Sequence, residues 1–137
     1  MDRRTRRQLI ERLRADADRI CAEFGLRYQA IEAERANVKS RYGICYSDGT
    51  IRVRLNHATT RKPLKYSSLV NTLCHELAHL KHFDHSPRFQ TFYQRILHWA
   101  RQQGIYRPGR PAARAPKAPT PKRSPARDSG PEQLTLF

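Results

Sequence analysis

The sequence predicts an α+β domain followed by a disordered C-terminal tail. Three segments carry apolar residues at the three- and four-residue spacing of amphipathic helices, and three short runs after the first of them resemble β-strands. Residues 107–132, in contrast, are rich in proline and contain no large apolar side chain. Such a stretch cannot bury enough surface to offset the entropy lost on ordering, so we expect the folded domain to span residues 1–106.

The first predicted helix spans residues 5–24. Its apolar side chains recur at helical spacing from Leu9 to Phe24, and Gly25 is placed to end the helix. The opposite face carries several arginines. That face suits either a solvated surface or a contact with phosphates.

The β-like runs lie at residues 28–34, 42–46 and 50–55. Ser47-Asp48-Gly49 joins the last two runs, and Asp-Gly at such a junction predicts a hairpin. Arginines alternate with apolar residues in the last run, as in a strand with one buried face: Ile51, Arg52, Val53, Arg54 and Leu55. We therefore expect a small antiparallel or mixed sheet.

The second helix is expected to begin at Ser67 or Ser68, because either serine can cap it, and to end near His82 or Phe83. The third helix should begin at Ser86, which is followed by Pro87 at the first helical position. Its inward face is expected to consist of Phe89, Phe92, Tyr93, Ile96, Leu97 and Ala100, before the helix ends at Gly104.

The second helix contains the pattern His75-Glu76-Leu77-Ala78-His79. Positions i and i+4 lie on the same face of a helix, so His75 and His79 present two imidazoles side by side, as two ligands of a zinc ion do. Glu76 is placed to reach a water on that metal without binding the metal itself. A glutamate in that position can act as the general base of a hydrolase.

A catalytic zinc site needs a third protein ligand. His82 shares the helix face, but its backbone is ~10 Å from that of His75 at ~1.5 Å rise per residue, too far for two bonds of ~2.1 Å to one ion. His85 lies past the expected helix end, where the chain can turn back to the metal. The sequence therefore favours His85 as the third ligand, with Asp84 as a weaker candidate.

Three further side chains on or before the third helix are candidates for steadying a developing oxyanion: Arg88, Tyr93 and His98. The competing interpretation for each is an ordinary packing or surface role. Cysteines are scattered, odd in number and never in a Cys-x-x-Cys pair, which argues against a disulfide framework and a zinc ribbon. Together with the absence of an apolar signal segment after Met1, this favours a cytoplasmic location.

The chain is strongly basic, with a formal net charge of +15 and a sequence pI near 10.7. Residues 1–106 carry about +10 of this charge, and the remainder lies in the tail. A basic excess on both parts predicts a polyanionic partner, with nucleic acid as the favoured class. The alternative is a surface that is charged only for solubility.

Several motifs resemble those of the YgjP-like metallopeptidases, relatives of the SprT-like and Wss-type proteases. They are Lys-Ser-Arg-Tyr-Gly-Ile-Cys at 39–45, Asp-Gly-Thr-Ile at 48–51, Leu-Asn at 55–56, Pro63, and His-Glu-Leu-Ala-His at 75–79 through His-Ser-Pro-Arg-Phe at 85–89. The resemblance implies a zincin-like fold with a short sheet beside the active-site helix, Zn²⁺ on His75, His79 and His85, and Glu76 as the base. The family often has Trp-Gly-Ser-Cys where this chain has Tyr-Gly-Ile-Cys at 42–45.

The chain ends with the pentapeptide Gln133, Leu134, Thr135, Leu136 and Phe137. Apolar residues at the tip of a predicted disordered tail suit a peptide that fills a pocket on a partner. The pentapeptide resembles the motif that binds the bacterial DNA polymerase sliding clamp, with threonine at the variable middle position. Residues 107–132 would then be a basic linker between the domain and this clamp-binding peptide.

These observations lead to three hypotheses. The first is a nucleoid-associated bacterial zinc metalloprotease that is tethered to the sliding clamp and cleaves DNA-bound or DNA-crosslinked proteins. The second is a clamp-associated DNA-binding adaptor with a structural zinc, which predicts a fourth protein ligand such as Asp84 or His82. The third is a zinc hydrolase of a non-protein substrate, because water activation does not specify a peptide bond.

Overall fold

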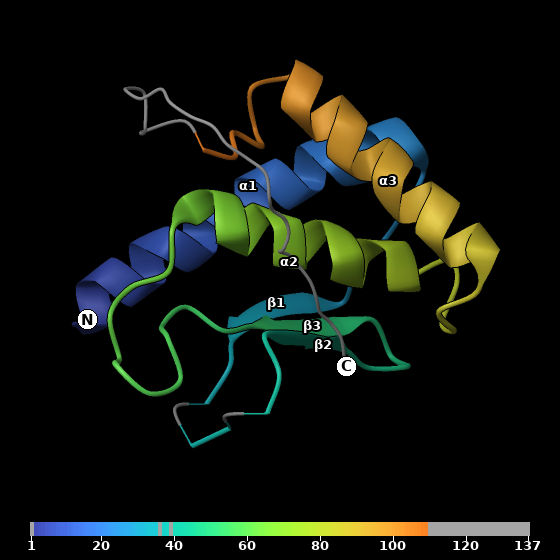
Figure 1. The fold of residues 1–137 in the computed structure, drawn as a ribbon. Helices are drawn as coiled ribbons and strands as arrows, with labels where there is room; N and C mark the ends of the chain where they lie inside the picture. Colours follow the sequence, from blue (N-terminus) through green and yellow to red (C-terminus); the bar gives the residue numbers. More distant parts are fainter. Residues whose placement is uncertain (1, 36, 39, 110–137) are drawn as a thin grey trace.

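The computed structural model describes residues 2–35, 37–38 and 40–109. In this part of the chain, one helix is followed by three strands and then by two helices. Their order is α1 (Arg3–Phe24), β1 (Ala30–Ala33), β2 (Gly43–Cys45), β3 (Thr50–Val53), α2 (Tyr66–His79) and α3 (Pro87–Gln102) (Figure 1). The expected α+β class is therefore confirmed. Residues 110–132 of the predicted linker and the clamp-binding peptide at 133–137 lie outside the described residues.

The three strands form one mixed sheet in the order β1-β3-β2. β2 and β3 pair antiparallel with Cys45 opposite Ile51, which confirms the predicted hairpin. Gly49 supplies the left-handed turn conformation with φ of 93°, and Asp48 Oδ1 accepts a hydrogen bond of 2.8 Å from the Thr50 amide. β1 joins the other side of β3 in parallel, with Ile31 opposite Ile51.

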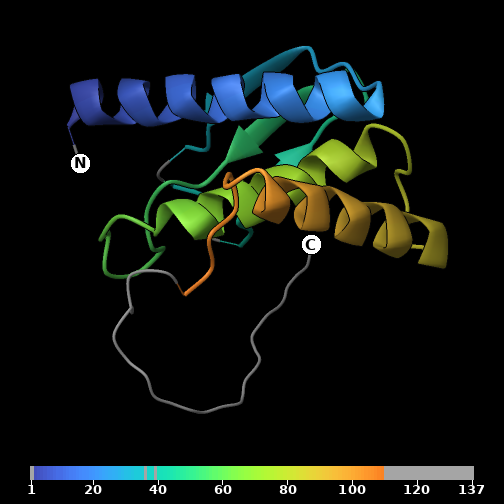
Figure 2. The ribbon, with the colours of Figure 1, turned by 90° about the horizontal axis from the view of Figure 1, so that it is seen from above.

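All three helices lie on the same side of the sheet (Figures 1 and 2). α1 packs on β1, α2 packs on β2 and β3, and α3 packs against α2 and α1. Their apolar faces and the inner face of the sheet bury one core, whose largest fully buried members are Phe89, Leu13, Ile20, Ile31, Ile51, Leu69, Leu73, Leu77 and Ile96. Among the described helices, none combines the length and apolar character that a membrane crossing requires.

α1 begins two residues earlier than the apolar spacing predicts. Asp2 caps the helix, since its carboxylate accepts a hydrogen bond of 2.7 Å from the Thr5 amide. Gly25 ends the helix as predicted, in the left-handed conformation with φ of 68°. Both ends are therefore set by local chemistry.

The predicted serine cap of α2 is wrong. The helix begins at Tyr66 with Lys65 at the cap position and no side-chain capping bond. A tertiary contact fixes this first turn, because the Tyr66 hydroxyl donates a hydrogen bond of 2.6 Å to Asp16 on α1. The helix also ends at His79, earlier than the expected His82 or Phe83.

α3 begins as predicted, with Ser86 as its cap and Pro87 in its first turn. The Phe89 amide donates to Ser86 Oγ at 3.4 Å. The helix ends at Gln102, two residues before Gly104, which takes the left-handed conformation with φ of 76°. This start matters for function because it places the chain reversal directly after His85.

One side chain of the third β-like run departs from the predicted alternation. Arg54 follows β3 and is only 6% exposed, although the pattern placed it on the solvent face. The residues between β1 and β2 cover it, and its guanidinium donates to the carbonyls of Arg41 (3.0 Å) and Val38. Burial of an arginine here follows from a loop whose path strand periodicity does not predict.

Candidate metal centre

His75 and His79 meet one turn apart near the C-terminal end of α2. Their Nε2 atoms lie 3.2 Å apart and their ring centroids 4.9 Å apart. His79 is buried and His75 is half-buried, so helix geometry and packing together hold both rings toward one point. The structure thus places this pair as the i, i+4 spacing predicts.

His85 completes the cluster from outside the helix. The chain reverses between α2 and α3, and the His85 ring centroid then lies 4.8 Å from that of His79 and 5.5 Å from that of His75. The three candidate ligand atoms all lie within 4.8 Å of one another. A three-histidine cluster is therefore present, with His75 and His79 on α2 and His85 in the loop that leads to α3.

The two competing candidates for the third ligand lie outside the cluster. Asp84 points its carboxylate at the Ser86 amide at 3.4 Å, which helps to form the turn before α3. The His82 ring packs edge-on against Phe92, with centroids 5.8 Å apart. Among the described residues, the group that can hold a metal ion consists of His75, His79 and His85.

His82 still affects the cluster through its backbone. His79 Nδ1 lies 3.0 Å from the His82 carbonyl oxygen. A carbonyl can only accept, so Nδ1 carries the proton and Nε2 keeps its lone pair for a metal. Because α2 ends at His79, the chain can turn so that the His82 carbonyl reaches the His79 ring. A hydrogen bond of this kind orients a metal-binding histidine.

The electrostatic setting keeps His75 and His79 neutral, as metal ligands must be. Burial, followed by the neighbouring His79 and His85, lowers the pKa of His75 to about 3. Burial also lowers the pKa of His79, although the hydrogen bond to the His82 carbonyl opposes this shift. A neutral imidazole has one nitrogen lone pair, which a metal cation can accept.

The cluster fits a divalent ion such as zinc. Two ligands bonded at ~2.1 Å to a tetrahedral ion lie ~3.4 Å apart, close to the 3.2 Å between the Nε2 atoms of His75 and His79. Three protein ligands leave a fourth position for water or substrate. Among the described residues, the group whose candidate ligand atoms lie this close together has three members.

Glu76 is buried beside the cluster, with 4% of its surface exposed. It faces β2, where a Cβ added at Gly43 would lie 3.1 Å from Glu76 Oε2 and 2.6 Å from the Thr72 methyl carbon. Glycine at this position therefore allows the strand to approach the helix. Burial raises the pKa of Glu76 to about 8, and the Arg41 charge opposes that rise.

Two aromatic side chains of α3 pack against the histidines, and the sequence did not predict these contacts. Phe89 is fully buried and stacks on His79 with ring centroids 4.3 Å apart. Tyr93 meets His75 edge-on at 5.1 Å, and its hydroxyl donates to Asn71 Oδ1. The sequence signal was present, because Phe89 and Tyr93 are one helical turn apart on the predicted inward face.

Of the three oxyanion candidates, the structure brings Tyr93 to the cluster. Arg88 and His98 are exposed on α3. His98 lines a shallow surface groove with Phe24 and Trp99 on the side of α3 that faces α1. The arrangement therefore favours Tyr93 as the polar group of α3 nearest to His75.

The YgjP-like metallopeptidase domain family matches residues 1–103 of the chain. The fold is similar to that of Wss1 from Saccharomyces cerevisiae, with a TM-score of 0.61 and 20% identity over 70% of this chain and 79% of that one. Wss1 from S. pombe is also similar, with a TM-score of 0.55 and 24% identity over 65% of this chain and 75% of that one. No curated protein matches the sequence.

Proposed function

This chain belongs to the YgjP-like metallopeptidase domain family, and on that basis we propose that it is a zinc-dependent protease of DNA-bound or DNA-crosslinked proteins. The observation that carries the proposal is a cluster of three histidines with a buried glutamate at its side. Family membership gives the class of enzyme, and the cluster gives the residues. The identity of the metal as zinc, the DNA-bound substrate and the tethering to the clamp are our proposals.

In the proposed hydrolysis, three histidines bind the metal and one glutamate transfers the proton. His75, His79 and His85 would hold the metal through neutral imidazole nitrogens. When bound, zinc supplies a Lewis acid that lowers the pKa of a coordinated water toward ~7. Glu76 would accept a proton on its carboxylate and could return it to the leaving amine.

The number of candidate ligands favours a catalytic zinc over a structural zinc, because the group that could hold the metal has three members among the described residues. An adaptor with a structural site would need a fourth protein ligand, and the two side chains proposed for it point elsewhere. Asp84 accepts from the Ser86 amide, and the His82 ring packs on Phe92.

The DNA part of the proposal rests on charge. Residues 1–106 carry about +10 and the tail adds about +5, so the whole molecule attracts a polyanion. A nucleoid-associated protease with this charge would meet its substrates on DNA. The pentapeptide at 133–137 supports tethering to the bacterial sliding clamp, which would raise the local concentration of the enzyme near replicated DNA.

The Glu76→Gln variant tests the assignment of the base. We expect it to bind zinc stoichiometrically and to lose at least ~100-fold in the cleavage of a protein crosslinked to a DNA oligonucleotide, since general base catalysis contributes 10²–10⁴-fold. Glu23→Gln, an exposed change of the same kind on α1, is the matched control. Full activity of Glu76→Gln would exclude the base.

The same assay separates the substrate class from the chemistry. Wild-type protein is given the crosslinked protein, the same protein without DNA, or the crosslinked protein with a chelator. The proposal requires faster cleavage of the crosslinked substrate and loss of cleavage with chelator. Equal cleavage with and without DNA would limit the function to a general metalloprotease.

A further inference from the structure

A polar cavity lies apart from the histidine cluster. It opens between α1 and the segments that follow β1 and β3, and it has a volume of about 150 Å³. The polar side chains that line it and bear on the argument are Arg6, Glu34, Arg35, Arg54, Asn56 and Arg61. We call this cavity the arginine pocket. A polar cavity of this size holds several water molecules, which a small anionic group can replace.

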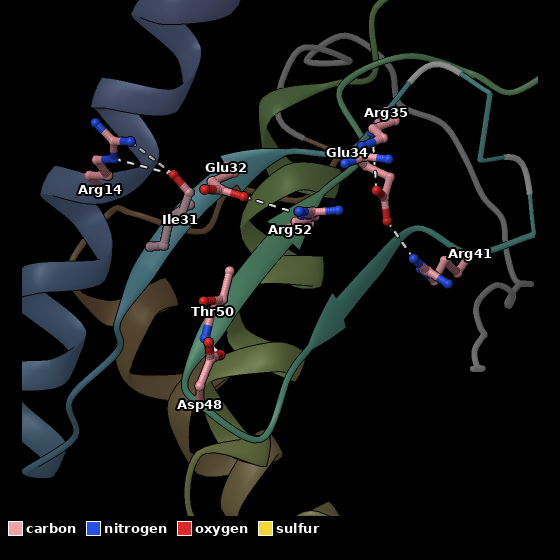
Figure 3. A network of polar contacts seen from close by, with 9 residues as sticks. All are labelled: Arg14, Ile31, Glu32, Glu34, Arg35, Arg41, Asp48, Thr50 and Arg52. Carbon is pink, nitrogen blue, oxygen red and sulfur yellow. Dashed lines mark hydrogen bonds and ion pairs between the residues drawn. The ribbon is translucent and has the colours of Figure 1, made fainter.

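The charge of the arginine pocket is strongly positive. Four guanidinium groups line it against a single carboxylate, that of Glu34. This carboxylate is already engaged, since its Oε2 pairs with Arg41 Nε at 3.0 Å and its Oε1 accepts from the Arg35 amide at 3.0 Å (Figure 3). The lining arginines therefore exceed the acidic charge available to them within the described residues.

Arg54 brings a buried charge to the pocket. Its side chain uses one Nε donor for the Arg41 carbonyl and one Nη donor for the Val38 carbonyl. A guanidinium has five N–H donors, so donors remain beyond these two bonds. Burial lowers the pKa of Arg54, while Glu34 opposes the shift. A buried cation that keeps its charge is stabilised by an anion with several acceptor oxygens.

Arg61 lines the pocket and has a backbone conformation that is unfavourable for a residue other than glycine. Among the described residues it is the one non-glycine with positive φ, at 65°. Its turn is fixed by hydrogen bonds, with Asn56 Nδ2 donating to the Arg61 carbonyl at 2.9 Å and the His57 amide donating to the Lys62 carbonyl at 2.8 Å. Strain maintained by the surrounding structure is common at binding sites.

We propose that the arginine pocket binds a backbone phosphate of nucleic acid. The inference rests on the proposed association with DNA and names the place on the folded domain where that association is made. A phosphate offers acceptor oxygens in the geometry that guanidinium forks match. A polyanion is favoured over an isolated anion because the basic excess extends over the whole domain and the tail.

The test compares two double variants of the full chain that lose the same charge. Arg35→Gln/Arg61→Gln removes two exposed guanidiniums of the pocket, and glutamine keeps a side chain at the strained position 61. Arg19→Gln/Arg101→Gln removes two exposed guanidiniums from α1 and α3 outside the pocket. Binding to a fluorescein-labelled DNA duplex is followed by anisotropy over a range of salt concentrations.

The pocket variant is expected to lower the slope of log K against log salt by ~0.9, the value for the loss of one phosphate contact, and the control variant by much less. Arg35→Lys/Arg61→Lys keeps the charges and should restore most of the slope, which excludes a folding defect at these positions. Equal losses in the pocket and control variants would overturn the pocket while leaving DNA binding intact. Poly-glutamate that binds with the same pocket dependence would overturn its assignment to nucleic acid.

The result does not depend on the proposed catalysis, because binding is measured without turnover. If wild-type protein binds no duplex, both the pocket and the DNA part of the proposed function fail, and the metalloprotease assignment stands on its own test. If the duplex binds through the pocket and Glu76→Gln still cleaves, the proposed base fails and the pocket stands.

Discussion

At the scale of single residues, burial places an electrostatic cost on the Glu76 carboxylate in the metal-free protein. Burial raises its pKa from 4.5 to about 8. Between these values the unfolded chain loses the proton while the folded chain keeps it, so the free energy of unfolding falls as pH rises. Below pH 4.5 both states are protonated, and the penalty is absent.

Glu76→Gln removes this titration. At pH 7.5 the metal-free variant should therefore be more stable than metal-free wild type by a few kcal/mol, at ~1.4 kcal/mol per pKa unit. At pH 4 the two proteins should unfold at similar denaturant concentrations. Urea unfolding in the presence of a chelator measures both values. A stability difference that is the same at both pH values would contradict the cause assigned to the shift.

His82 and His85 both follow α2, and they are expected to make different contributions to metal binding. His85→Gln should weaken zinc affinity by more than ~100-fold, because it removes a direct ligand, whereas even partners of ligands contribute 10–100-fold. His82→Gln should retain zinc, since His82 orients His79 through its backbone carbonyl. Competition with a chromophoric chelator gives both affinities. Zinc loss in His82→Gln with retention in His85→Gln would reverse the assignment.

The sequence predicted the residues of the cluster better than their surroundings. The i, i+4 spacing of His75 and His79 is a property of any helix, and the distance argument that disfavoured His82 uses helix rise alone. The burial of Arg54 and the stacking of Phe89 on His79 depend on which segments meet in space. No local pattern contains that information.

At the scale of elements, helix starts show how local chemistry and tertiary contacts compete. Asp2 and Ser86 cap their helices as residues of their type do. The two serines expected to cap α2 lie inside the helix, because the bond from Tyr66 to Asp16 extends it by one or two residues. Capping rules hold where nothing from outside the segment overrides them.

This difference makes a paired prediction. Ser86→Ala should lower the free energy of unfolding by ~1 kcal/mol, since the Phe89 amide loses its acceptor. Ser68→Ala should change stability by less than ~0.5 kcal/mol, because Ser68 is an exposed helix residue that caps nothing. Urea unfolding of the metal-free proteins separates the two. A larger effect at Ser68 would mean that α2 is capped as the sequence predicts.

At the scale of the whole molecule, the sequence predicted a mixed or antiparallel sheet without its strand order. The hairpin of β2 and β3 has a local signal in Asp48-Gly49. The parallel pairing of β1 with β3 has none, since it depends on how α1 packs over the sheet edge. The mixed order becomes visible only when helices and strands are assembled.

The whole chain also joins a catalytic domain to a peptide far from it in sequence. If residues 133–137 bind the sliding clamp and the cluster binds zinc independently, deletion of the pentapeptide should abolish clamp binding and leave zinc content at one ion per chain. If residues 107–132 form the flexible linker that the sequence predicts, these 26 residues would have a root-mean-square span of ~28 Å, and the two parts could act at separate places. Surface plasmon resonance on immobilised clamp and elemental analysis measure the two properties.

A matched variant makes this last prediction specific. Thr135 occupies the variable middle position of the motif, so Thr135→Ser should bind the clamp as wild type does. Phe137→Ala removes the terminal aromatic ring and should weaken binding by at least ~100-fold, about the effect of losing one interface anchor of 2–4 kcal/mol. Equal affinity of wild type and the truncated chain would assign any clamp contact to residues 1–132, because the two proteins share these residues.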